Sequence, residues 1–242
     1  MQSVIEAGLE TLGLNGQVPE TTGEQLAEYV RLLLEKNQVM NLTAIRDPLQ
    51  AARLHMLDCA GLLSCPGLGI ETFTGKTLID VGTGAGFPGL PLKVMVPSLQ
   101  VTLLDSLSKR VDWLEEVAQT LNLSDVIAIH ARAEEQAHVK GWRDHFDFAT
   151  ARAVADLRIL TELCLPFVRV GGRFLAMKSI DCTSEVEGAA HAIQLLGGRI
   201  RNCLDYTIPD TQVTHRVVII EKVAPTLKGY PRRWAKIQKE PL

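Results

Sequence analysis

The sequence predicts an α/β fold in which helices cover both faces of a mostly parallel sheet. Short apolar runs alternate with segments of helical periodicity from residue 76 onward, a pattern typical of βαβ units. The first of these runs is followed by a glycine-rich loop. Residues 1–75, in contrast, carry only helical periodicity, so we expect a helical extension before the sheet.

Length and composition exclude several classes of protein. The chain has 242 residues, 46% of them hydrophobic, and a net charge of −3, which is enough for a hydrophobic core without disulfides or metal. The charge excludes a generally polycationic coat protein but allows a local basic patch. The five cysteines show no metal-ligand spacing and no signal peptide or membrane-length apolar run is visible. We therefore expect a cytoplasmic, monomeric protein that uses neither a metal nor a membrane.

The helical extension is predicted from two amphipathic segments. The first has a helical face formed by Leu26, Tyr29, Val30, Leu33 and Leu34, with Thr21 or Thr22 as its N-cap. The second runs from about residue 48 to 63 and ends at the Cys-Pro-Gly-Leu-Gly segment, residues 65–69. Residues 76–242 then form the ligand-binding domain and a basic C-terminal tail.

Seven strands are predicted in that domain. They cover residues 77–81, 101–104, 126–129, 146–150, 173–177, 200–206 and 216–221. Helices are predicted over residues 107–121, 157–168 and 185–196, the last two ended by the glycine pairs at 171–172 and 197–198. No helix separates the last two strands, so a hairpin joins them and one strand runs antiparallel.

The loop after the first strand has the residues of a nucleotide-binding loop. Gly82, Gly84 and Gly86 lack the side chains that would keep a ligand away from the backbone. Asp105 ends the second predicted strand, where a carboxylate accepts hydrogen bonds from ribose hydroxyls. The alternative is that Asp105 only stabilises the N-terminus of the next helix.

The acid that precedes the loop indicates the charge of the ligand. Asp80 is unfavourable beside a pyrophosphate but favourable beside a cationic nucleoside such as S-adenosylmethionine. A methyltransferase is therefore the leading interpretation and a nicotinamide-dependent oxidoreductase the second. An RNA-binding module without enzymatic activity is disfavoured by the intact loop.

Several motifs along the chain carry a family resemblance. They are Asn41-Leu-Thr-Ala-Ile-Arg-Asp47, His55-Met-Leu-Asp58, the loop extended through Gly-Phe-Pro-Gly89 with Pro91, Ala133-Glu134, Ala151-Arg-Ala153 and Met177-Lys178. Over residues 41–230 the sequence resembles the GidB, or RsmG, family of bacterial small-subunit ribosomal RNA guanine-N7 methyltransferases. It departs from the family pattern at Asp105, where Glu is frequent, and at Ser179, where Gly is usual.

The resemblance implies a Rossmann-like class I S-adenosylmethionine-dependent methyltransferase with a seven-stranded sheet. The methyl acceptor would be N7 of guanine 527 of 16S ribosomal RNA. Together with the loop argument, the predicted cofactor-binding residues are Asp80, Gly82, Thr83, Gly84, Gly86, Phe87, Asp105, Ala133, Glu134 and Arg152. Glu134 could instead be a first-turn helix acid, and Phe87 could pack beneath the loop. The alternative function is a methyltransferase of the same fold that acts on another RNA, a protein or a small molecule.

Guanine N7 already carries a lone pair and no hydrogen, so its methylation needs no general base. Positioning and exclusion of water are what the protein must supply. We predict that Arg152 reaches guanine O6 and leaves N7 open, with Arg132 and Lys178 as alternative catalytic residues that could bind phosphate instead. His55 is predicted to be a structural partner of Asp58 rather than a base.

The C-terminal tail, residues 228–239, combines five cations with two aromatic residues and no acid. Lys228, Arg232, Arg233 and Lys236 are the predicted contacts to 16S ribosomal RNA or the small ribosomal subunit. Arg31, Lys36, Arg46 and Arg53 could extend the same basic face. The alternative is an ordinary solvated terminus.

Overall fold

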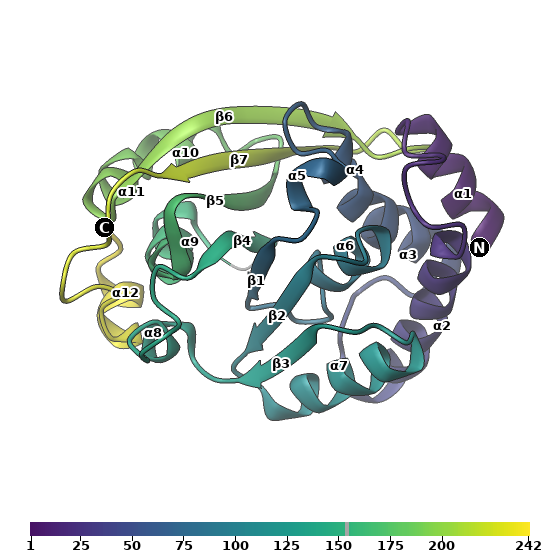
Figure 1. Cartoon of the computed structure of the whole chain (residues 1–242), viewed down its shortest axis with the longest axis horizontal. Coiled ribbons are helices and arrows are strands. Elements are labelled where there is room, and N and C mark those ends of the chain that lie inside the picture. Colours follow the sequence, from purple (N-terminus) through teal and green to yellow (C-terminus); the bar gives the residue numbers. More distant parts are fainter. Residues whose placement is uncertain (153–154) are drawn as a thin grey trace.

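A computed structural model describes residues 1–152 and 155–242 of the chain. Ala153, the last residue of one quoted motif, lies outside the described residues. A seven-stranded sheet crosses the molecule and helices cover both of its faces (Figure 1). The predicted α/β class with a mostly parallel sheet is confirmed.

The strand order is β3-β2-β1-β4-β5-β7-β6. The strands are β1 Thr77–Val81, β2 Gln100–Asp105, β3 Val126–His130, β4 Phe146–Arg152, β5 Val168–Ser179, β6 Gly198–Thr207 and β7 Thr214–Lys222. Strand β7 is antiparallel to both β5 and β6, and the other neighbouring pairs are parallel. The predicted hairpin with one antiparallel strand is therefore confirmed.

Helices come first along the chain. They are α1 Gln2–Thr11, α2 Thr22–Met40, α3 Pro48–Ala51, the π-helical segment Ala52–Leu57, α4 Asp58–Ser64 and α5 Ile70–Phe73. Thr21 occupies the N-cap position of α2, although its side chain makes no capping bond. The predicted inner face of α2 is buried except for Leu34, which is partly exposed. The second predicted helix is interrupted by the π-helical segment, a feature frequent at functional sites.

The remaining helices lie between and after the strands. They are α6 Gly89–Met95, α7 Ser108–Thr120, α8 Ala133–Gln136, α9 Leu157–Cys164, the 3-10 segment Leu165–Phe167, α10 Thr183–Gly188, α11 Ala190–Leu195 and α12 Trp234–Lys239.

The predicted role of the glycine pair at residues 171–172 was wrong, because these residues lie inside β5. A Cβ atom on Gly172 would lie 2.5 Å from the carbonyl oxygen of Asp147 in β4. The absence of a side chain therefore allows two strands to approach closely. Helix α9 ends at Cys164 instead of continuing to residue 168.

Two apolar clusters fill the space on either side of the sheet. One includes residues of α1, α2, α4, α6 and α7, so the N-terminal helices share a core with the sheet. The other includes residues of α9, α11 and α12. The parallel strands end at one edge, and their connections diverge between β1 and β4, where open α/β sheets bind ligands.

Candidate active site

The glycine loop between β1 and α6 is held in a conformation that depends on its glycines. Gly82, Gly84 and Gly86 have φ angles of 67°, 60° and 85°, in the left-handed region that side chains disfavour. A Cβ atom on Gly86 would lie 2.3 Å from the hydroxyl of Tyr29. That hydroxyl donates a hydrogen bond to the carbonyl of Ala85 at 2.5 Å, so helix α2 supports the loop from below.

Asp80 organises this loop from behind. Its Oδ2 accepts hydrogen bonds from the hydroxyl of Thr83 at 2.6 Å and from the backbone N–H of Gly89 at 3.1 Å. Its Oδ1 accepts from the hydroxyl of Thr150 at 3.0 Å. Complete burial raises the pKa of Asp80 to about 6, although these bonds act to lower it. Asp80 and Thr83 therefore shape the loop, and their direct contact with a cofactor stays a prediction.

One cavity, which we call the β2–β3 cavity, opens where β1, β2 and β3 end and has a volume of about 300 Å³. Four of the predicted cofactor residues line it: Gly82, Asp105, Ala133 and Glu134. Asp105 is oriented by backbone N–H groups of Gly84 and Leu107, each 2.9 Å from one of its carboxylate oxygens. The structure therefore brings together an acid, a glycine and the segment after β3, as the sequence predicted.

Arg132 belongs to the same cavity. Its Nε donates to Glu134 Oε1 at 2.7 Å, and its guanidinium lies 5.8 Å from the ring centre of Trp234. Neither Arg152 nor Lys178 lines this cavity. The structure thus separates Arg132 from the two residues with which it was grouped as a catalytic candidate.

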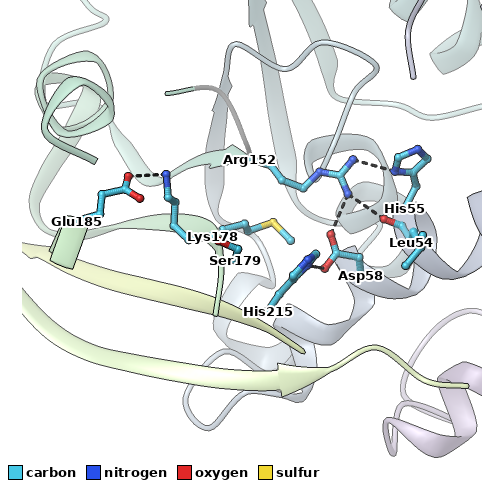
Figure 2. Close-up of a pocket in the computed structure, with 9 residues that line it drawn as sticks. Leu54, His55, Asp58, Arg152, Lys178, Ser179, Glu185 and His215 are labelled. Carbon is cyan, nitrogen blue, oxygen red and sulfur yellow. Dashed lines mark hydrogen bonds and ion pairs between the residues drawn. The ribbon is translucent and has the colours of Figure 1, made fainter. Parts of the chain in front are cut away.

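A second cavity of about 400 Å³, the β4–β5 cavity, lies where β4 and β5 end. It is lined by Leu54, His55, Asp58, Arg152, Met177, Lys178, Ser179, Glu185 and His215 (Figure 2). The residues come from the π-helical segment, α4, α10 and three strands. The sheet therefore carries two cavities at one edge, each lined by charged as well as apolar residues.

Arg152 is the centre of a buried ion-pair network in the β4–β5 cavity. Its Nη1 donates to Asp58 Oδ2 at 2.9 Å, and its guanidinium stacks 4.6 Å from the ring centre of Phe87. The other oxygen of Asp58 is bonded to the hydroxyl of Tyr206 at 2.9 Å and to His215 Nδ1 at 2.7 Å. Burial acts to raise the pKa of Asp58, but these partners outweigh it and the pKa is lowered. Arg152 and Phe87 therefore contact each other, and neither lines the β2–β3 cavity.

His55 connects this network to the loop after α2. Nη2 of Arg152 lies 3.2 Å from His55 Nδ1, and arginine can only donate, so Nδ1 is the acceptor. In the neutral ring, Nε2–H then donates to the hydroxyl of Thr43 at 2.9 Å. His55 and Asp58 are linked through Arg152, which bonds both, so the predicted structural partnership between them is indirect.

Acidification should therefore destabilise the protein through His55. Burial, with Arg152, lowers the pKa of His55 to about 4, whereas the unfolded chain protonates near 6.5. The unfolded state binds the proton first as pH falls, so stability is lost from about pH 6.5 down to the folded pKa. Between pH 7 and 4.5 we expect this residue to remove about 2 kcal/mol from the free energy of unfolding.

The measurement is urea unfolding at both pH values for the wild type and for His55→Gln. Glutamine can accept from Arg152 and donate to Thr43 but does not titrate. The variant should lose less stability on acidification than the wild type. An equal loss in both proteins would show that His55 has an unperturbed pKa.

Lys178 is held by acceptors on the rim of the β4–β5 cavity. Its Nζ donates to the carbonyl of Ala155 at 2.9 Å and pairs with Glu185 Oε1 at 2.5 Å. Figure 2 shows this pair on the opposite side of the cavity from Asp58 and His55. Lys178 therefore lines the same cavity as Arg152, and its ammonium group already has two acceptors.

The predicted RNA-binding residues differ in their surroundings. Lys228, Arg233 and Lys236 are exposed. Arg232 is not available, because its Nη2 lies 2.6 Å from Oε2 of Glu162, a completely buried carboxylate. The prediction that Arg232 binds RNA is corrected to a structural ion pair.

Two of the additional basic residues, Arg31 and Lys36, do not extend the tail. Arg31 pairs with Glu28 and Glu35, Lys36 pairs with Glu116, and Arg53 pairs with Asp210. Helix α2, which carries Arg31 and Lys36, lies at the end of the molecule opposite α12 (Figure 1). These two residues therefore do not share a face with the tail.

Several residues of the two cavities were not singled out from the sequence. They are Thr43 of the network behind the β4–β5 cavity, His215 on β7, and Ser106, Leu160, Leu163 and Trp234 around the β2–β3 cavity. Thr43 lies in the Asn41–Asp47 motif of the family resemblance, but its chemistry alone did not indicate that it contacts His55. Trp234 was noted only as an aromatic residue of the basic tail.

The part of the chain that the structure describes contains no helix long and apolar enough to cross a bilayer. Within residues 1–152 and 155–242, no three or more His, Cys, Asp or Glu side chains are grouped so that they could hold a metal ion.

Comparison with known proteins identifies the family. The family model GidB, described as rRNA small subunit methyltransferase G, matches residues 22–213. A protein of that name from Alkaliphilus metalliredigens is 42% identical over 99% of this chain and 98% of its own. Another, from Lachnoclostridium phytofermentans, is 43% identical over 97% and 95%. The crystal structure of a ribosomal protein methylase from Lactobacillus delbrueckii subsp. bulgaricus shares the fold, with a TM-score of 0.50, 18% identity, and coverage of 69% of this chain and 77% of that chain.

These matches confirm three predictions made from the sequence: the family, a methyltransferase activity and S-adenosylmethionine as the methyl donor. The oxidoreductase interpretation is set aside. The family model and the relatives span nearly the whole region that contains both cavities. The chain belongs to the GidB family, the rRNA small subunit methyltransferase G family.

Proposed function

We propose that this protein transfers a methyl group from S-adenosylmethionine to N7 of one guanine of 16S ribosomal RNA, by resemblance guanine 527. The observation that carries the proposal is the pair of cavities at one sheet edge. One contains Asp105, a carboxylate at a position suited to bind a ribose, and the other contains the fixed cation Arg152. The reaction would take place in the cytoplasm on the RNA or on a small-subunit particle.

The residues of the β2–β3 cavity fit the cofactor. Two oxygens of Asp105 each retain lone pairs beyond their backbone bonds and can accept from a ribose diol. Gly82 lets the backbone approach the ligand closely, and Ala133 and Glu134 can frame the adenine. When bound, S-adenosylmethionine supplies an electrophilic methyl group on a sulfonium.

The β4–β5 cavity is suited to position a guanine without removing a proton. His55 is neutral with both ring nitrogens bonded, and Lys178 is paired with Glu185. Arg152 has five N–H donors, so its bonds to Asp58 and His55 leave others for guanine O6. N7 then remains open, and alignment with exclusion of water accelerates the transfer.

The substrate class is tested by the transfer of a labelled methyl group. The protein is incubated with labelled S-adenosylmethionine and either undermethylated small-subunit RNA, large-subunit RNA or ribosomal proteins. We expect label only in small-subunit RNA. Label in large-subunit RNA or in ribosomal protein would instead support the alternative methyltransferase function.

The exposed cations of the tail are expected to contribute to RNA affinity. Each phosphate contact adds about 0.7–0.9 to the slope of log K against log salt. Replacing Lys228, Arg233 and Lys236 with glutamine should therefore make that negative slope shallower by roughly 2. The slope is measured from RNA binding at several salt concentrations. Point variants are needed, because deleting residues 228–242 would also remove Trp234 from the β2–β3 cavity.

The matched control replaces two cations at the opposite end of the molecule, Arg31→Gln and Lys36→Gln, which should leave the slope unchanged. If the tail variant has the wild-type slope, these three cations do not contact the RNA.

A further inference from the structure

The C-terminal segment forms a wall of the β2–β3 cavity. Trp234, the first residue of α12, lines that cavity together with Ala133 and Glu134. The same indole also lines a groove of about 540 Å³, shared with Glu135, His138 and Arg233. Figure 1 shows α12 and α8 next to each other at one end of the molecule. The indole therefore separates the cavity from the outer groove.

This wall is fastened to the domain by buried and charged contacts. Arg232, the residue two positions before Trp234, is held by Glu162 through its backbone N–H at 2.7 Å and its guanidinium. Arg143 donates to the carbonyls of Tyr230 and Thr226, each at 2.8 Å. Ile237 is completely buried on the next turn of α12. These contacts show that the C-terminal segment packs against the domain and is not a solvated tail.

The position and chemistry of the Trp234 indole indicate that it contacts a nucleobase. Leu104, Leu160 and Leu163 give the cavity an apolar interior beside Asp105. A ribose bonded to Asp105 at the end of β2 would direct its base toward the segment after β3, where Trp234 faces Ala133 and Glu134. A flat aromatic ring is the side chain on which a purine stacks, and Arg132 lies over the same ring.

We propose that Trp234 covers the adenine base of the cofactor, and that the ion pair between Arg232 and Glu162 positions it there. The proposal rests on the proposed function, because it assigns the β2–β3 cavity to S-adenosylmethionine. It extends the cofactor site to the C-terminal helix, whose sequence suggested only RNA contacts.

The test measures the binding of S-adenosylhomocysteine and of adenosine by calorimetry. Stacking of a base on an aromatic side chain contributes about 1–3 kcal/mol, so Trp234→Ala should raise the Kd of both ligands by roughly 10-fold to 100-fold. Trp234→Phe keeps an aromatic ring and should stay within a few-fold of the wild type. The Kd of adenosine should rise by the same factor as that of S-adenosylhomocysteine, because the proposed contact is with the adenine base that both ligands share.

Fluorescence gives a readout that does not depend on the stability of the alanine variant. The chain has three tryptophans, and replacing Trp113 and Trp142 with phenylalanine leaves Trp234 as the reporter. We expect S-adenosylhomocysteine to change the emission of Trp234 in a saturable way. A matched protein that keeps only Trp142 should not respond, because Trp142 lies before β4 and lines a different cavity, at the starts of β2 and β3.

The possible failures are distinguishable. If the wild type binds S-adenosylhomocysteine but Trp234→Ala binds it with the same Kd, or if the Trp234 emission does not change, the proposed contact is wrong. If the folded wild type does not bind S-adenosylhomocysteine at all, the proposed function itself is wrong.

Discussion

Replacing Arg152 with alanine should lower the rate of methyl transfer by about 100-fold to 1000-fold, the effect of removing a fixed donor from a reacting site. It should also lower the free energy of unfolding by roughly 3–5 kcal/mol, because it leaves the buried carboxylate of Asp58 without its cation. The rate is measured in single turnovers with saturating cofactor and RNA, and stability by urea unfolding. Cofactor affinity should change little, since Arg152 does not line the β2–β3 cavity.

Arg152→Lys is the matched control. It keeps a cation beside Asp58 but loses the planar group that stacks on Phe87 and bonds His55 at the same time. We expect near-normal stability with an intermediate rate. Full turnover by Arg152→Ala would contradict the role assigned to this residue.

Replacing Asp105 with alanine should raise the Kd for S-adenosylhomocysteine by about 100-fold. Hydrogen bonds to a charged group contribute roughly 1.5–3 kcal/mol each, and two ribose hydroxyls would lose their acceptor. The backbone N–H groups of Gly84 and Leu107 would lose theirs as well. Calorimetry measures the affinity, and Asp105→Asn, which keeps one acceptor oxygen, should lie between alanine and the wild type.

The ligand itself supplies a control for this prediction. The wild type should bind adenosine more tightly than 2′-deoxyadenosine, and Asp105→Ala should bind the two almost equally. An unchanged Kd combined with reduced stability would mean that Asp105 only supports the loop and the start of α7.

Much of the fold could be predicted because its signals are local. The apolar run at residues 77–81 and the glycines after it require only neighbouring residues to be recognised. The glycine pair at 171–172 was misinterpreted for the same reason. Its function is the close approach of β4, which is distant in the sequence.

Some residues of the candidate site could likewise be predicted from local signals and others could not. Asp105 ends a strand of a parallel sheet, and Gly82, Ala133 and Glu134 follow such strands, so their convergence at one edge follows from topology. The partners of Asp58 could not be predicted, because His215 lies 157 residues away and Tyr206 lies 148 away. The basic composition of the tail likewise concealed Arg232, whose partner Glu162 is 70 residues earlier.

The orientation of the Asp80 side chain is a feature of the loop that the sequence did not reveal. Its carboxylate is completely buried and bonded to Thr83, Gly89 and Thr150. A sequence indicates that an acid stands beside glycines. It does not indicate which way the side chain points.

Under the proposed function, the protein positions a nitrogen that is already nucleophilic and removes no proton. This claim is tested by the single-turnover rate of methyl transfer to small-subunit RNA as a function of pH, with the product nucleoside identified. We predict 7-methylguanosine and a rate constant within about twofold from pH 7 to 9, since no group has to lose a proton in this range. A rate that rises about tenfold per pH unit, or a methyl group on a nitrogen that carried hydrogen, would contradict the claim.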